Sequence, residues 1–253
     1  MFAGLVILAF VYVSSLYHRA PAHLLPGAVD ETGAFKHTEK GQYWDIEASV
    51  SDRTQLWRWW NSGPDTRLRT TIETWLTANI EEFKRNTSPQ LLPPEDLQTL
   101  EERGGYTYGA QYKRFTSSSE KLLSYQYDIY MDTGGAHPNG YFKTFVFDKD
   151  GTEIKLADLF VPGSNYLDRL AATSLAQITK DLTDRLSAEA STTLFAEGLA
   201  PKEDNFSNFV IDGDTLVLLF PPYQVAAYAA GSFEVRIPLS EFSDILRPEW
   251  KQR

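Results

Sequence analysis

The stretch that decides the fold runs from Tyr106 to Tyr130 and reads YTYGAQYKRFTSSSEKLLSYQYDIY. Aromatic or small apolar residues occupy alternate positions on both sides of its serine-rich centre. Such alternation is typical of half-buried β-strands, so the stretch predicts two strands joined by a turn. Tyr141–Phe147 predicts a further aromatic strand, and Asp148–Gly151 predicts the turn that follows it.

Two segments show the three- and four-residue steps of an amphipathic helix. The first is predicted to begin at a capping box, Ser62–Asp65, and to end near Asn86, before a proline-rich loop. The second follows Ser164. The apolar stripes are Leu68, Ile72, Trp75, Leu76, Ile80 and Phe83 in the first, and Leu167, Leu170, Ala171, Ser174, Leu175, Ile178, Leu182 and Leu186 in the second.

Four more strands are predicted, one before the first helix at 44–50 and three near the end of the chain at 209–211, 216–220 and 233–237. The strands come in blocks, with two long helices and no regular strand–helix–strand alternation. This pattern predicts an α+β fold of antiparallel sheets, each packed by one long helix.

The N-terminal region indicates export. Phe2–Val13 is an uninterrupted apolar run without charge, shorter than the roughly 20 residues of a full membrane span. A cleaved signal peptide, an N-terminal anchor and a buried core helix all fit it. We expect residues 1–19 to be the signal peptide or anchor, with the body extracytoplasmic on the cell membrane, or secreted after cleavage. Residues 20–43 are expected to form an irregular linker.

Composition excludes several classes of protein. The chain has 253 residues, with 24 Lys and Arg against 34 Asp and Glu, a net charge of −10. This acidic balance argues against nucleic-acid binding. The absence of cysteine excludes disulfides, thiolate metal sites and cysteine nucleophiles. No P-loop, Gly-x-Ser-x-Gly, His-Glu-x-x-His or Gly-x-Gly-x-x-Gly motif occurs. We therefore predict no cofactor and no metal site.

One histidine stands out. His18, His23 and His37 fall in or beside the expected linker as solvated residues, whereas His137 lies in the segment Thr133-Gly-Gly-Ala-His-Pro138 between two predicted strands. Gly134 and Gly135 permit a sharp turn there. In such a turn a histidine can be a general base, a metal ligand or a ligand contact, or it can simply hold the shape of the turn.

Two aromatic segments leave similar alternatives open. Leu56–Trp60 carries three tryptophans, and Phe220–Gly231 carries Tyr223 and Tyr228 among prolines and alanines. Exposed, such rings stack on sugars or bases; buried, they are core. The second segment is thus either a binding lip or a packed corner.

Three motifs in this order resemble a bacterial extracytoplasmic module: Tyr125-x-Tyr127 with Gly134-Gly-Ala-His-Pro138, Phe147-Asp-Lys-Asp-Gly151 with Ile154-x-Leu156-x-Asp158-Leu-Phe160, and Phe220-x-Pro-Tyr-x-Val-Ala-x-Tyr-Ala-x-Gly231. The module is shared by RsiV-type lysozyme-responsive anti-sigma factors and the N-terminal part of PdaC-type peptidoglycan deacetylases. The resemblance covers roughly residues 44–240. It implies a non-catalytic α+β unit of two adjoining subdomains, which we expect at 44–142 (PdaC-like) and 143–253 (RsiV-like).

The resemblance implies binding in the cell envelope. Because no deacetylase domain follows the module and no cytoplasmic stretch precedes the apolar run, we expect neither deacetylation nor sigma-factor binding to carry over. The expected ligand is peptidoglycan or a lysozyme-like protein, and the acidic body suits a cationic partner. The predicted ligand-binding residues are Tyr127, Gly134, Gly135, His137, Tyr223 and Tyr228.

Two other functions remain open. One is a cell-envelope hydrolase that uses His137 with a nearby carboxylate, for which Asp128 and Asp132 are candidates by sequence. The other is a purely structural envelope protein. Exposure distinguishes a ligand contact from a core residue: if Tyr127 or Tyr223 is buried, it belongs to the core.

Overall fold

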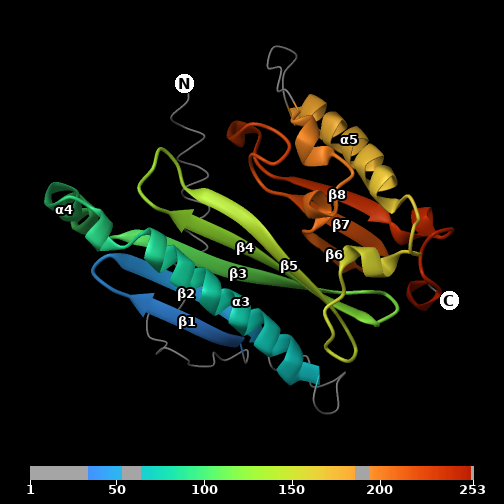
Figure 1. Cartoon of the computed structure of the whole chain (residues 1–253), viewed down its shortest axis with the longest axis horizontal. Coiled ribbons are helices and arrows are strands. Elements are labelled where there is room, and N and C mark those ends of the chain that lie inside the picture. The colour runs from blue at the N-terminus through green and yellow to red at the C-terminus, as the bar shows by residue number, and fades with distance from the viewer. Residues whose placement is uncertain (1–33, 53–63, 186–193, 252–253) are drawn as a thin grey trace.

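The computed structural model describes residues 34–52, 64–185 and 194–251 (Figure 1). The N-terminal apolar run, the Leu56–Trp60 cluster, the cap at Ser62 and Leu186 lie outside the described residues. These described residues form two sheets, of five and three strands, each accompanied by one long helix. The predicted α+β fold is confirmed. In the described ranges, no helix has both the length and the apolar character needed to cross a bilayer.

The larger sheet has the strand order β1-β2-β3-β4-β5. Its strands are β1 (Ala34–Lys40), β2 (Trp44–Asp52), β3 (Tyr106–Thr116), β4 (Leu122–Asp132) and β5 (Asn139–Asp148). All neighbours are antiparallel except β2 and β3, which are parallel. The predicted antiparallel pairing is confirmed for the other three pairs of this sheet, and the pair β2–β3 differs from it. Parallel neighbours need a long crossover, and the chain supplies it through α3 (Pro64–Asn86) and α4 (Pro94–Glu102).

Two predictions of irregular chain differ from the structure. Residues 34–40, expected within the linker, form β1, an edge strand held by antiparallel pairing with β2. His37 therefore lies in a strand beside Ala48 of β2 rather than in a tether. The proline-rich loop after α3 contains the helix α4, which starts at Pro94. Proline suits the first helical turn because the N–H it lacks would have no partner there.

The smaller sheet contains β6 (Phe209–Asp212), β7 (Thr215–Phe220) and β8 (Phe233–Pro238), all antiparallel. Helix α5 (Tyr166–Arg185) packs against it, as Figure 1 shows. Leu170, Ser174, Ile178 and Leu182 are buried as the stripe predicted, whereas Leu175 is 49% exposed. Short 3-10 helices make up much of the remainder: Pro89–Leu91, Leu156–Leu159, Ala196–Leu199, Glu203–Phe206, Tyr228–Ala230, Leu239–Phe242 and Pro248–Trp250.

The central strands of the molecule are buried on both faces. Aromatic residues of β4 and β5, including Tyr127 and Phe145, face α3 in one core. On the opposite face, the hydroxyls of Ser124 and Thr144 accept hydrogen bonds from the backbone N–H groups of Ile211 (3.0 Å) and Phe209 (2.9 Å). An edge strand of a sheet leaves backbone N–H groups without partners. These two hydroxyls accept from such N–H groups at the edge of β6. The expected boundary at 142/143 falls inside β5, whose Phe145 belongs to the core under α3 and whose Val146 belongs to the core of the smaller sheet.

Candidate functional site

Two loops, one from each sheet, meet at one end of β4 and β5. His137 comes from the β4–β5 loop, and Tyr223 and Tyr228 come from the β7–β8 loop. The Tyr223 hydroxyl lies 3.0 Å from His137 Nε2. The Tyr228 ring stacks on the His137 ring with centroids 3.7 Å apart, and its hydroxyl donates to the Pro138 carbonyl at 2.8 Å. We call these three side chains the loop cluster.

Hydrogen bonds fix the orientation of the His137 ring. Nδ1 lies 3.0 Å from the Pro138 carbonyl oxygen, which only accepts, so Nδ1 is the nitrogen that donates. In the neutral ring Nε2 is then the acceptor for the Tyr223 hydroxyl. The loop cluster thus presents a tyrosine held by a histidine, and that histidine is oriented by a backbone carbonyl.

The carboxylates near His137 in sequence are engaged elsewhere. Asp128 accepts from Gln126 at 2.7 Å and pairs with Lys113 at 3.1 Å. Asp132 pairs with Arg103 at 3.1 Å and accepts from the Gly134 N–H at 2.9 Å. Within the described part of the chain, no carboxylate bonds to His137. The arrangement therefore lacks the acid that would orient a catalytic histidine.

The two glycines of the turn differ. Gly134 has φ = +78°, and a Cβ there would lie 2.1 Å from Nη1 of Arg103. Gly135 has no positive φ, and a Cβ there would meet only the His137 carbonyl oxygen, at 3.9 Å. The conformation of the turn therefore requires glycine at 134 and tolerates a side chain at 135.

Tyr223 occupies a strained position at the surface. Its φ is +71°, which costs a non-glycine residue about 1–2 kcal/mol, and the residue is 54% exposed. The next residue, Gln224, anchors the loop. Its side-chain Nε2 donates to the backbone carbonyls of Gly198 (3.2 Å) and Asn205 (2.8 Å). A strained, exposed side chain with fixed support is typical of a functional position.

Tyr127 does not belong to the loop cluster. It is fully buried under α3, with its ring 5.4 Å from Trp75 and 6.2 Å from Phe145. Burial, followed by the fields of neighbouring tyrosines, raises the pKa of Tyr127 well above its ordinary value. The prediction that Tyr127 contacts a ligand is corrected, because α3 covers that face of β4.

Sequence reasoning missed two supporting residues. Arg103 braces the glycine turn through Asp132, yet no pattern around it signals that contact. Burial and then the fields of Asp132 and Tyr228 raise the pKa of Tyr130, which places this residue beside the loop cluster. The alternation of β4 did not signal Tyr130, because Tyr130 lies one position out of phase with Tyr125 and Tyr127 and so on the opposite face of the strand.

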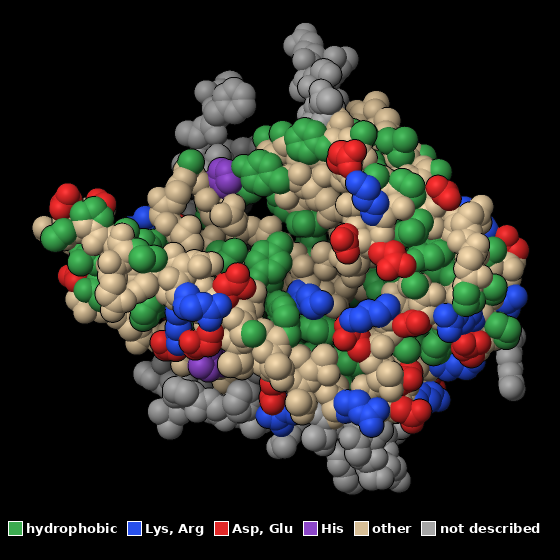
Figure 2. All heavy atoms as spheres, viewed as in Figure 1, with side chains coloured by type: hydrophobic (Ala, Val, Ile, Leu, Met, Phe, Trp, Pro, Cys, Tyr) green, Lys and Arg blue, Asp and Glu red, His purple; other side chains and the backbone are tan. Residues whose placement is uncertain are grey.

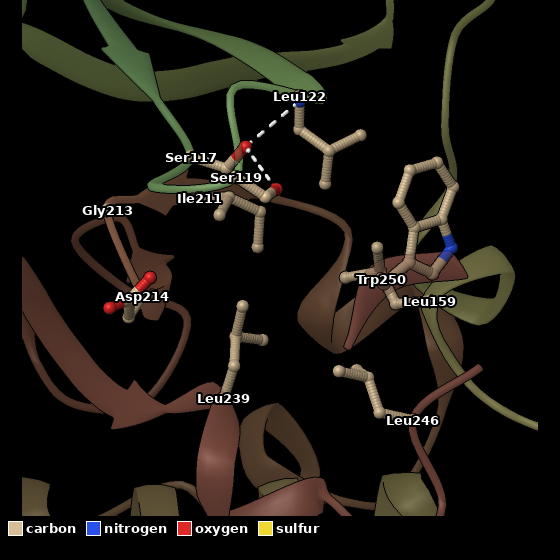
Figure 3. Close-up of a pocket in the computed structure, with 10 residues that line it drawn as sticks. All are labelled: Ser117, Ser119, Leu122, Leu159, Ile211, Gly213, Asp214, Leu239, Leu246 and Trp250. Carbon is tan, nitrogen blue, oxygen red and sulfur yellow. Dashed lines mark hydrogen bonds between the residues drawn. The ribbon is translucent and has the colours of Figure 1, made fainter. Parts of the chain in front are cut away.

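An enclosed pocket elsewhere is too small to hold a ligand. It lies below the Ser117–Leu122 turn, between Leu159, Leu239 and Trp250, and has a volume of about 10 Å³ (Figure 3). The Ser117 hydroxyl already bonds to the Leu122 N–H at 3.0 Å and to Ser119 at 3.2 Å. This volume corresponds to about one water molecule. Among the described residues there is likewise no group of three or more His, Asp or Glu that could hold a metal ion.

A segment in the C-terminal half of the chain has a family match. Residues 157–240 match the family described as protein of unknown function (DUF3298), and this range runs from the 3-10 helix before α5 through β8. The match covers about a third of the chain, and the loop of Tyr223 and Tyr228 lies inside the matched range. The glycine turn of His137 lies outside the matched range.

Two curated relatives match parts of the chain. It is 31% identical over 133 residues to the peptidoglycan-N-acetylmuramic acid deacetylase PdaC of Bacillus subtilis, which covers 52% of this chain and 28% of PdaC. It is 29% identical over 113 residues to an esterase of Mycobacterium tuberculosis, covering 44% of this chain and 47% of the esterase. The chain spans less than half the length of either relative. The suspected relation to the PdaC module is confirmed.

Solved structures share the fold. A DUF3298 protein from Pseudomonas aeruginosa matches with a TM-score of 0.52 at 19% identity, covering 91% of this chain and 94% of that one. A DUF3298 protein from Bacteroides fragilis matches with a TM-score of 0.51 at 16% identity, covering 85% and 92%. The fold is therefore shared with these two proteins over most of the chain.

Proposed function

We propose that this chain is a non-catalytic module of the cell envelope that binds peptidoglycan through the loop cluster. The observation that carries the proposal is the exposed ring of Tyr223, held in a strained backbone position and bonded to His137. An immobilised aromatic ring loses little conformational entropy on binding, so it suits stacking on a sugar face. The PdaC relation supports a peptidoglycan ligand.

The location is part of the same proposal. We propose that residues 1–19 direct the chain to the extracytoplasmic side, as a membrane anchor or as a signal peptide that is removed. The uncharged run Phe2–Val13 supports this location, and a peptidoglycan ligand requires it. Cell fractionation with an antibody against the body of the protein tests it: recovery from the cytoplasm would contradict the proposal.

The direct test is co-sedimentation of the purified full chain with insoluble peptidoglycan sacculi. We expect saturable binding, weakened about tenfold in Tyr223→Ala, which corresponds to about 1.4 kcal/mol for one lost aromatic contact. Leu175→Ala is the matched control, because it removes an exposed apolar side chain from α5, outside the loop cluster. No sedimentation of the wild type, or equal binding of both variants, would contradict the proposal.

A lysozyme-like protein is the other ligand to measure. Calorimetric titration with lysozyme, in parallel with the sacculi, separates the two. Binding to lysozyme alone, at low salt and lost at high salt, would indicate attraction of a cationic protein by the acidic body rather than sugar recognition.

The esterase relative keeps the hydrolase alternative testable. The pair of Tyr223 and His137 is the only histidine-to-hydroxyl contact that the described residues show. Ester and glycan hydrolysis should be assayed with the wild type and with His137→Ala. Turnover that His137→Ala abolishes in a folded protein would replace the binding proposal with the hydrolase.

A further inference from the structure

A second concave site lies on the α3 side of the large sheet. It is an open groove of about 480 Å³ between α3, which contributes Thr74 and Trp75, and β5, which contributes Lys143 and Phe145. Glu153 and Lys155, which follow β5, complete one wall. Figure 2 shows this face hollowed near its centre, with hydrophobic side chains in the hollow and basic side chains beside it. The volume is within the roughly 300–1,000 Å³ of small-molecule sites.

The aromatic wall of the groove is rigid. The half-buried ring of Trp75 packs edge-on to Phe145 at 5.5 Å and against Tyr127 at 5.4 Å. These contacts fix the indole before any ligand arrives, so binding does not have to order it. A fixed, partly exposed indole offers a flat apolar surface to the C–H face of a sugar ring.

Lys143 is the unusual residue of the groove. It occupies a position of β5 that faces α3, between Tyr141 and Phe145, and is half-buried. Its Nζ lies 4.8 Å from the centroid of the Phe145 ring. Burial lowers the pKa of Lys143, against the opposing field of Glu153. A partly desolvated ammonium is costly unless an anion compensates it.

The ammonium of Lys143 is available to an anionic ligand, because the nearby carboxylate of Glu153 is paired with Lys155. Within the described ranges, Lys143 forms no ion pair and no hydrogen bond, whereas the neighbouring Lys155 is paired with Glu153. The groove therefore combines one unpaired, half-buried ammonium with an aromatic wall and threonine hydroxyls. Glu153 acts on Lys143 through its field, but no described carboxylate forms a direct ion pair with it, and an anionic ligand would supply that pair.

We propose that this groove is a second saccharide subsite, which takes an amino sugar carrying a carboxylate. The sugar ring lies on Trp75, the carboxylate pairs with the ammonium of Lys143, and the hydroxyl of Thr74 lies within the groove for the sugar hydroxyls. The inference rests on the proposed function for the identity of the glycan, and it deepens that function by naming which sugar is recognised. The carboxylate belongs either to a lactyl group on the sugar or to an attached peptide.

Calorimetry with the full chain tests the inference. The probes are N-acetylmuramic acid, whose carboxylate is on the lactyl group; N-acetylmuramyl-L-alanyl-D-isoglutamine, whose carboxylate is on the peptide; and N-acetylglucosamine, which has neither. We expect at least one acidic probe to bind about tenfold more tightly than N-acetylglucosamine, the effect typical of one charge-assisted hydrogen bond. Whichever acidic probe binds more tightly identifies the source of the carboxylate.

The decisive variant is Lys143→Met, which removes the charge and keeps an unbranched apolar stem over Phe145. We expect it to lower the affinity for the acidic probe about tenfold and to leave N-acetylglucosamine unchanged. Lys149→Met is the matched control, because Lys149 is exposed in the turn after β5 and outside the groove. Equal affinity of Lys143→Met and the wild type for the acidic probes would overturn the inference.

Failure of this inference and failure of the proposed function are distinguishable. If the chain sediments with sacculi through Tyr223 and neither acidic probe binds, the groove subsite is wrong and peptidoglycan binding stands. If an acidic probe binds in a Lys143-dependent way and sacculi do not sediment the chain, the groove subsite stands and the loop cluster is not the peptidoglycan site.

Discussion

Tyr127 and Tyr223 carry the same side chain in two aromatic clusters that behave differently. Tyr127 belongs to the buried cluster beneath α3, in which the rings of Trp75, Phe145 and Tyr112 pack against its own ring. Tyr223 belongs to the loop cluster. Its side chain is more than half exposed, and its hydroxyl is hydrogen-bonded to His137. Aromatic rings stabilise the fold in the first cluster and remain available to a ligand in the second.

The comparison shows that an aromatic side chain stabilises the fold where another element covers it and can contact a ligand where none does, whatever its residue type. Helix α3 is fastened over the first cluster by Asn79, whose side-chain oxygen accepts from the hydroxyls of Tyr108 and Tyr141, both at 2.6 Å. No helix of the described chain covers Tyr223. Substitutions in the two clusters should therefore separate stability from binding.

The largest expected effect is that of Tyr127→Ala. Removal of a fully buried aromatic ring leaves a cavity under α3, and large-to-small changes of this kind cost about 3–5 kcal/mol. Urea unfolding followed by circular dichroism measures the loss, with Tyr223→Ala as the control, expected to change stability by less than about 0.5 kcal/mol. Similar losses in both variants would remove the distinction between the clusters.

The next effect concerns the opposite face of the same strand. Ser124→Ala leaves the buried N–H of Ile211 without its acceptor, which costs about 1–3 kcal/mol. The same unfolding measurement checks it. Ser118→Ala is the control, since its exposed hydroxyl lies outside this buried contact. If Ser124→Ala unfolds like the wild type, the hydroxyl does not hold the edge of β6.

A smaller effect is expected in the turn that supports the loop cluster. Gly134→Ala places a Cβ at φ = +78° against the Arg103 guanidinium, and we expect a loss of about 1–2 kcal/mol. Because His137 follows in the same turn, sacculus binding should weaken as well. Gly135→Ala is the matched control and should be close to neutral. Equal behaviour of both alanine variants would show that the turn rearranges freely.

The smallest effect appears only at high pH. Burial raises the pKa of Tyr127, and burial with a hydrogen bond to Glu203 raises the pKa of Tyr166 to about 12. A raised pKa means that the unfolded chain loses the proton first, so the stability is intact below about pH 10 and falls as the pH rises towards 12. Unfolding midpoints between pH 8 and about 11.5 measure it. A smaller decline in Tyr166→Phe than in the wild type is expected, and an identical decline would assign the effect to other groups.

Much of the fold could be predicted from local patterns. Alternation located β3, β4 and β5, and the stripe from Leu68 to Phe83 located α3, because period and burial are coupled in both element types. Edge strand β1 was missed because its sequence, AFKHTEK, is largely polar and its strand geometry depends on pairing with β2. Such pairing is a tertiary contact that no local period reveals.

The candidate site was predictable in part. The glycines around His137 indicated a shaped turn, and the structure does place His137 with Tyr223 and Tyr228, 86 and 91 positions away in sequence. The prediction that Tyr127 contacts a ligand was wrong because a sequence motif does not show which element covers a side chain. Here α3 covers Tyr127. Lys143 offered a local signal, a charge at an aromatic position of β5, but only the three-dimensional structure shows that, among the described residues, no carboxylate forms an ion pair with it.

The two hydroxyls that meet β6 also bear on how this module can be recombined. The family match spans residues 157–240 and so includes β6 but neither Ser124 nor Thr144, which satisfy its edge. If that segment were grafted onto a first half with alanine or valine at both positions, two buried backbone donors would have no partner. A chimaera between homologues should therefore fold when residues 124 and 144 are transferred together with the segment. These two residues lie outside the matched range, yet the matched segment depends on them.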